Sequence, residues 1–218
     1  MQGILGSLKL TVIGSLVLTA ILFVAVRLLL GTGLHVDHAW GAFLMRWLHV
    51  VSGVMWLGLL WYFNFVQIPG MPNIPDAQKP AIGKVIAPTA LWYFRWAAKA
   101  TLVTGLLLAW MNGYIGHALA LGLTDGGAST PIGIGMWLAM IMWFNVWFVI
   151  WPLQKKALGI VPVPEEEKAA ASRKAMLVSR ANTMLSLPML YCMVAMQNGG
   201  FSSKTEPRAP LDVNCGRG

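Results

Sequence analysis

The sequence predicts an all-α integral membrane protein, a helical bundle of about five transmembrane helices. Hydrophobic residues make up 57% of the 218 residues, charged residues only 11%, and the mean hydropathy is +0.64. This composition is typical of membrane proteins and excludes an ordinary soluble domain. Several apolar runs also reach the roughly 20 residues that a helix needs to cross the hydrocarbon layer. We see no internal repeat, and we expect one membrane domain over residues 1–200 and a polar, disordered tail over residues 201–218.

The first expected span covers residues 8–30, where only Arg27 interrupts the apolar run near its end. This run is too long for a signal peptide and no small-residue cleavage site follows it, so we expect a retained helix. The other four spans are expected at residues 42–66, 96–114, 132–151 and 175–197. The third of the five spans could continue to Leu121. We expect Pro152 to end the fourth span, because proline cannot donate a helical hydrogen bond.

Two connecting segments have a character of their own. Residues 67–88 are rich in proline, and we expect them to follow an extended path against the helix ends. Residues 164–176 place glutamates early and basic residues late, which suits a helix dipole. We therefore expect a short surface helix leading into the fifth span.

The loops alternate in charge, and this pattern predicts the orientation of the chain. Residues 31–41 and 112–131 contain no Lys or Arg, whereas the two other long connections are basic. The positive-inside rule places the basic loops and the N-terminus in the cytoplasm and the C-terminus in the periplasm. Because the basic residues flank apolar spans, the net charge of +8 indicates topology in a lipid bilayer and no nucleic-acid partner.

His49 lies inside the second span and is the most informative residue of the chain. An ionisable side chain at a helix centre costs about 2.5–3.5 kcal/mol on insertion scales, so such a residue is a candidate functional residue. Arg46 lies one turn before His49, Gly53 one turn after it, and Trp56 two turns after it. This spacing fits a haem site with an axial ligand, a cation for a propionate, a gap for a flat ring and an aromatic neighbour. The alternative is a histidine that hydrogen-bonds a neighbouring helix.

The other histidines offer further candidate ligands on the same outer side. His49 and His117 could both be axial ligands of a haem between the second and third spans, if the third span continues far enough. His35 or His38 could instead supply the second ligand. His35, Asp37 and His38 also form a weaker candidate site for copper or zinc, and the alternative there is a solvated loop that caps the second helix.

The fourth span carries Trp143, Trp147 and Trp151 on one face and Asn145 at mid-depth. The stripe fits a packing face better than a cofactor site. Asn145 needs a hydrogen-bond partner in hydrocarbon. Its partner is either a neighbouring helix or a buried ring such as a quinone.

Four segments carry a resemblance to a known family. RWLHVVSGVMWLGLLWYFNFVQ (46–67) and WYFRWAAKATLVTGLLLAW (92–110) resemble the membrane domain of the bacterial membrane-bound urate hydroxylases, the urate oxidase N-terminal family. WFNVWFVIWPLQKKALGIV (143–161) and SRANTMLSLPMLYCMVAMQN (179–198) resemble its shorter members. The resemblance covers about residues 42–200, and LHVxSGxxWxG is its most specific part. In this family a c-type cytochrome usually follows the membrane domain and takes electrons from the oxidised substrate.

A more distant similarity links the chain to haem-binding membrane protoporphyrinogen oxidases and copper-resistance membrane domains. They share a histidine with a tryptophan seven residues later and then a tyrosine, here His49, Trp56 and Tyr62. The similarity implies that His49 is an axial ligand of haem b. The sequence departs from these families in three ways: it has no CxxCH motif, no His-rich segment between the second and third spans, and no equivalent of the oxidases' later lysine. The resemblance therefore implies a short form without the cytochrome c domain.

The resemblance implies a haem-b-binding electron-transfer protein of the urate-hydroxylase type in the bacterial inner (plasma) membrane. Urate is the implied substrate, and the electrons would pass to a separate cytochrome c or a quinone. If the chain is an enzyme it is an oxidoreductase, and the sequence does not identify its catalytic residues. The alternative is a cofactor-free accessory subunit of a larger respiratory or photosynthetic membrane complex. A third hypothesis is that the chain is a component of a copper or small-solute transport system.

Overall fold

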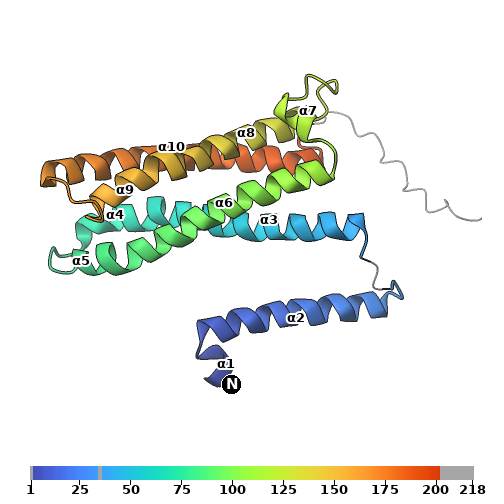
Figure 1. Cartoon of the computed structure of the whole chain (residues 1–218), viewed down its shortest axis with the longest axis horizontal. Helices are drawn as coiled ribbons and strands as arrows, with labels where there is room; N and C mark the ends of the chain where they lie inside the picture. Colours follow the sequence, from blue (N-terminus) through green and yellow to red (C-terminus); the bar gives the residue numbers. More distant parts are fainter. Residues whose placement is uncertain (1, 34–35, 202–218) are drawn as a thin grey trace, which may run out of the picture. The chain divides into compact units, whose positions relative to one another are not determined.

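The computed structural model describes residues 2–33 and 36–201, and every regular element within them is helical (Figure 1). Three continuous helical segments, Leu8–Leu29, His38–Asn73 and Thr130–Ala157, are long and apolar enough to cross a membrane. The predicted class of an all-α membrane protein is thus confirmed, whereas the number of five spans stays a prediction. The expected disordered tail lies outside the described residues, except for Phe201.

The chain divides into two compact units, Met1–Leu44 and Met45–Gly218. The first unit contains α1 (Gln2–Leu5), α2 (Leu8–Leu29) and the start of α3 (His38–Trp61). Within the described residues of this unit, no residue of α2 is buried. The single membrane domain that we expect over residues 1–200 is therefore still a prediction.

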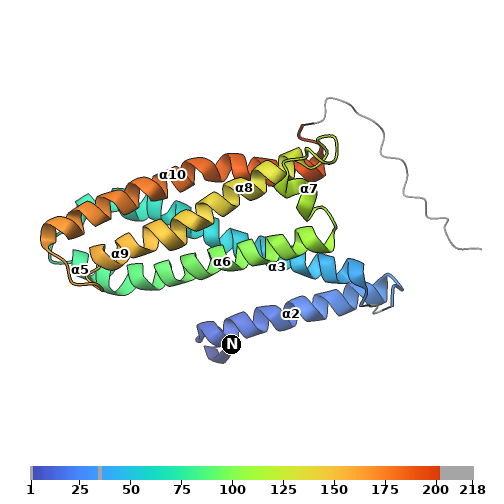
Figure 2. The ribbon, with the colours of Figure 1, turned by 45° about the horizontal axis from the view of Figure 1, so that its top comes forward.

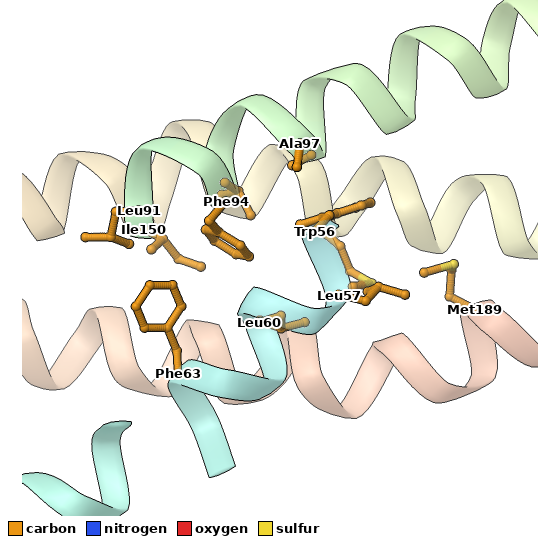
Figure 3. Packing of buried hydrophobic residues seen from close by; sticks show 12 residues of the cluster. Trp56, Leu57, Leu60, Phe63, Leu91, Phe94, Ala97, Ile150 and Met189 are labelled. Carbon is orange, nitrogen blue, oxygen red and sulfur yellow. The ribbon is translucent and has the colours of Figure 1, made fainter. Parts of the chain in front are cut away.

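The second unit is a bundle of long helices that run side by side in both views (Figures 1 and 2). It consists of the rest of α3, α6 (Ala87–Met111), α8 (Thr130–Phe144) and α10 (Glu165–Asn198). Its main core is centred on Trp56 and Leu60 of α3 and Phe94 of α6, which are almost fully buried (Figure 3). Small residues allow close approach, since a Cβ atom added to Gly135 of α8 would lie 3.2 Å from Cβ of Cys192 on α10.

Asparagine side chains connect these helices in the interior. Asn182, with 0% of its surface exposed, accepts a hydrogen bond from Nδ2 of Asn145 at 2.8 Å and donates one to the carbonyl of Met142 at 3.0 Å. Asn64 donates from Nδ2 to Oγ of Ser179 at 2.8 Å. The structure thus gives Asn145 a helix–helix hydrogen bond, the first of its two expected partners.

In the described part of the chain, π-helical segments interrupt the α-helices at η1 (Tyr62–Gln67), η3 (Ile82–Ile86) and η4 (Asn145–Ile150). The expectation that Pro152 ends the fourth span is wrong, because the helix continues directly from η4 into α9 (Trp151–Ala157). In an α-helix the proline ring would clash with the carbonyl four residues earlier. The wider π-helical turns that precede Pro152 give the ring room.

The proline-rich connection is not extended as expected but forms short helical turns. These turns are α4 (Ile68–Gly70), the 3₁₀ turn η2 (Met71–Asn73) and α5 (Lys79–Ala81), and each has a proline at its first or second position. In α5, which follows a turn, a proline costs little, because the first N–H groups of a helix have no partner within it. In contrast, α4 and η2 continue the helical segment that begins at His38. In the same way α6 continues directly from η3 and begins nine residues before the expected start of the third span.

Two other helix ends also differ from the expectation. The expected surface helix and the fifth span form one helix, α10, because no glycine or proline separates them. In contrast, α6 ends at Met111 and does not continue to Leu121. Gly113 follows with φ of +76°, a left-handed conformation that glycine adopts without steric cost, and a separate short helix, α7 (Ile115–Leu119), comes next.

Candidate cofactor site

A cavity of about 540 Å³ lies between α3, α6, α8 and α10 of the second unit. Its size is within the roughly 300–1,000 Å³ that small-molecule and cofactor sites occupy. Four of the residues singled out in the sequence line it: Arg46, His49, Gly53 and Trp56. Most of the remaining wall is apolar and includes Leu57, Leu108, Ile132, Met136, Met189 and Met193.

His49 is held by the neighbouring helix α6. Its Nδ1 lies 2.9 Å from the carbonyl oxygen of Thr101 and 3.2 Å from Oγ1 of Thr104. A carbonyl oxygen can only accept a hydrogen bond, so Nδ1 carries the proton and Nε2 keeps a free lone pair. Within residues 2–33 and 36–201, Nε2 makes no hydrogen bond. This is the arrangement of a metal-ligating histidine, which donates its other ring N–H to a carbonyl or carboxylate.

Gly105 provides the space for the imidazole ring. A Cβ atom at this position would lie 2.7 Å from Cε1 and 3.1 Å from Nδ1 of His49. Any side chain at position 105 would therefore displace the ring. Gly105 and Thr101 could not be predicted as site residues from the sequence, because only the pairing of α3 with α6 brings them to His49.

One end of the cavity is polar and positively charged. Arg46 and Tyr114 line it there, together with Asn198 at the end of α10. The cavity thus combines apolar walls with a cationic mouth, which suits a flat apolar ring that carries acidic groups at one edge.

Gly53 and Trp56 form part of the cavity wall one and two helical turns after His49 along α3. A Cβ atom on Gly53 would meet only Cγ2 of Thr101, at an ordinary contact distance of 3.8 Å, so the space around Gly53 is not tight. Trp56 is 1% exposed and belongs to the main core, and its Nε1 has no hydrogen-bond partner in the described part of the chain.

The structure does not bring His117 to the cavity. His117 lies on α7, is exposed, and its Nδ1 lies 2.7 Å from Oγ1 of Thr124. The pairing of His49 with His117 required a longer third helix, and α6 ends before that point.

The histidine cluster before α3 is not assembled in the described residues either. His35 lies outside them, and His38 is exposed at the first turn of α3, away from the cavity lining. Asp37 instead accepts a hydrogen bond from the backbone N–H of Trp40 at 2.8 Å, so it caps α3. Across the described ranges, no group of three or more His, Cys, Asp or Glu side chains could hold a metal ion.

The fold and the cavity define a class, the helical membrane proteins with a cavity inside the bundle. The model of the urate oxidase N-terminal family matches residues 113–206, so this stretch of the chain is similar to that family. The family resemblance expected from the sequence is thus confirmed there. The matched stretch contributes the α8 and α10 walls of the cavity, while His49 lies before it. Searches of the curated proteins and of the solved structures gave no match.

Proposed function

We propose that the chain is a haem-b-binding electron-transfer protein of the urate-hydroxylase type and that His49 is an axial ligand. One observation carries this proposal: the carbonyl of Thr101 fixes the proton of His49 on Nδ1, which leaves Nε2 free in a residue that lines a large apolar cavity. A histidine whose role was only to bond a neighbouring helix would not need this cavity. The match to the urate oxidase N-terminal family supports the same type of protein.

The residues of the cavity fit a haem. The Thr101 carbonyl orients the imidazole and increases the basicity of Nε2. Arg46 at the mouth supplies a positive charge for a propionate, and the apolar walls exclude water from the ring. Met136, Met189 and Met193 line the wall, and a thioether is the second ligand of haem in some cytochromes. When bound, haem b would supply one-electron chemistry whose potential depends on the axial ligands and on burial.

The place of the cavity suggests how the protein would work. Its mouth lies at the end of the bundle opposite the basic connections, which is the periplasmic side if the N-terminus is cytoplasmic in a bacterial inner membrane. Electrons from a substrate, urate in the family's chemistry, would then leave near this surface. A separate cytochrome c or a membrane quinone would accept them.

A reduced-minus-oxidised visible spectrum of the detergent-purified chain tests the proposal. We expect the α-band of a b-type haem in the wild type, its loss in His49→Ala, and its retention in the control His117→Ala, which changes an exposed histidine outside the cavity. A colourless wild-type protein from cells supplied with haem would contradict the proposal. That result would favour the alternative hypothesis that the chain is a cofactor-free accessory subunit, which should purify with a larger membrane complex.

A further inference from the structure

Cations and indole rings form a cluster between α6 and the helical segment made of η4 and α9. Cζ of Arg95 lies 3.4 Å from the centroid of the Trp151 ring. Nζ of Lys99 lies 5.1 Å from the Trp96 ring, and Nζ of Lys155 lies 5.8 Å from the Trp151 ring. We call this group the cation–indole cluster; it consists of Arg95, Lys99, Lys155, Trp96, Trp147 and Trp151.

The cluster is held in place by contacts between the helices. Nε1 of Trp147 donates a hydrogen bond to the carbonyl oxygen of Arg95 at 3.2 Å. The rings of Trp96 and Trp147 meet edge to face, with their centroids 5.7 Å apart. A ligand that binds here therefore meets side chains that are already ordered, which lowers the entropic cost of binding.

Within residues 2–33 and 36–201, no carboxylate forms a salt bridge with the three cations of the cluster. The salt bridges among the described residues use Lys79, Lys156 and Lys168, and none includes Arg95, Lys99 or Lys155. The sequences of α6 and of Thr130–Ala157 contain no Asp or Glu at all. Tryptophan rings attract a cation but carry no net charge, so they do not neutralise it. The cluster thus keeps a positive charge that an anion can neutralise.

An apolar groove of about 330 Å³ begins where the cluster ends, between the same two helices. Leu102 lies one turn beyond Lys99 on α6, and Trp143 lies one turn before Trp147 on α8. The groove is open toward the lipid, since Ile141 on its wall is 46% exposed. Its lining is apolar throughout: Leu102, Trp137, Met140, Ile141, Trp143 and Phe144.

We propose that α6 and the segment Thr130–Ala157 bind an anionic phospholipid, with its phosphate at the cation–indole cluster and an acyl chain in the groove. Charge complementarity selects an anionic head group, and the adjoining groove selects a ligand with a hydrocarbon chain. Tryptophans concentrate at the boundary between membrane and water, and basic pockets between transmembrane helices bind acidic head groups. The site is separate from the cavity around His49 and does not depend on haem.

Native mass spectrometry of the full chain in detergent tests the lipid site. The chain is titrated with phosphatidylglycerol and with phosphatidylcholine of identical acyl chains. We expect the wild type to bind phosphatidylglycerol about 10-fold or more tightly than phosphatidylcholine. The double variant Lys99→Gln/Lys155→Gln should lose this preference while it keeps the Arg95–Trp151 contact.

Two further variants separate the site from general effects of charge. Lys84→Gln/Lys174→Gln removes the same charge from exposed lysines that contact no ring of the cluster, and we expect it to keep the preference. Ile141→Trp fills the groove from a lipid-exposed position and should weaken the binding of both lipids. Equal binding of the two lipids by the wild type, or an equal loss in the two lysine double variants, would overturn the proposal.

Discussion

The position of His49 depends on a residue that has no side chain. Thr101 and Gly105 lie one turn apart on α6, so the carbonyl of the first and the bare backbone of the second form one surface beside the imidazole. The absence of a Cβ atom at Gly105 lets the ring come close enough to donate its proton to Thr101. The free lone pair on Nε2 is therefore a consequence of a glycine on a neighbouring helix.

Gly105→Ala should displace the imidazole ring of His49 and weaken haem binding. The added Cβ atom would lie 2.7 Å from Cε1 of His49, which no normal contact permits. Forcing an extra methyl group into a packed site costs about 1–3 kcal/mol, or roughly 5- to 150-fold in affinity. Haem titration followed by visible absorbance measures this change.

Gly58→Ala is the matched control for that substitution. Gly58 also lines the cavity, but a Cβ atom there would meet nothing within 4 Å. Both substitutions raise helix propensity equally, so a general effect on the helix would appear in both. Unchanged haem affinity in Gly105→Ala would show that the contact between these helices does not position the ligand.

The sequence allowed one side of the cavity to be predicted and not the others. Arg46, His49, Gly53 and Trp56 could be grouped because helical spacing places them on one face of a single helix. The opposite walls come from helices far along the chain, and no local pattern states which helices are neighbours. The prediction of His117 as a second ligand required the third helix to continue past Tyr114, but α6 ends at Met111 and Gly113 follows in a left-handed conformation.

At the scale of elements, the start of α8 is fixed by a single carboxylate. Oδ2 of Asp125 accepts a hydrogen bond from the backbone N–H of Ser129 at 3.0 Å, directly before α8 begins. Hydrogen bonds from the Ser129 side chain, and then from its backbone, lower the pKa of Asp125 from its ordinary value. The ionised carboxylate therefore stabilises the turn that leads into this helix.

Thermal stability should fall in acid, and part of the loss should depend on Asp125. A carboxyl group with a lowered pKa stabilises the fold above its ordinary pKa, and this stabilisation is lost as the pH falls through the lower pKa of the folded state. Between about pH 4 and pH 3 the melting temperature of Asp125→Asn should decrease less than that of the wild type. Thermal unfolding in detergent, followed by tryptophan fluorescence, measures the difference.

Glu166→Gln provides the comparison, because Glu166 is an exposed carboxylate at the start of α10. It should follow the wild type across the same pH range. A melting temperature of Asp125→Asn that runs parallel to that of the wild type would show that the cap does not stabilise α8.

At the scale of the whole molecule, the class could be predicted but the limits of the helices could not. Apolar composition and run length decide that a chain enters a membrane, and these properties belong to the sequence itself. Proline does not by itself mark the end of a helix. Pro88 and Pro152 each lie inside a continuous helical run, directly after η3 and η4, whose wider turns tolerate the ring.

Five spans require the basic and the uncharged connections to lie on opposite sides of the membrane. We expect an impermeant maleimide to label Leu123→Cys on intact cells and to label Lys84→Cys only after permeabilisation, both in a Cys215→Ser background. Both positions are exposed, whereas the native Cys192 is buried and should stay unlabelled. Labelling of both variants on intact cells would rule out the proposed orientation.

The π-helical segments mark positions at which the chain could have gained a residue during evolution. A π-helical turn pairs each N–H with the carbonyl five residues earlier, so it holds one residue more than an α-helical turn. A helix can therefore gain one residue at η1 or η4 without moving the faces that its two ends present to the bundle. Aligned relatives should show single-residue gaps inside residues 62–67 or 145–150, while His49 and Asn182 stay in register. Insertions, which elsewhere accumulate in loops, would then have been accepted in the middle of a membrane helix.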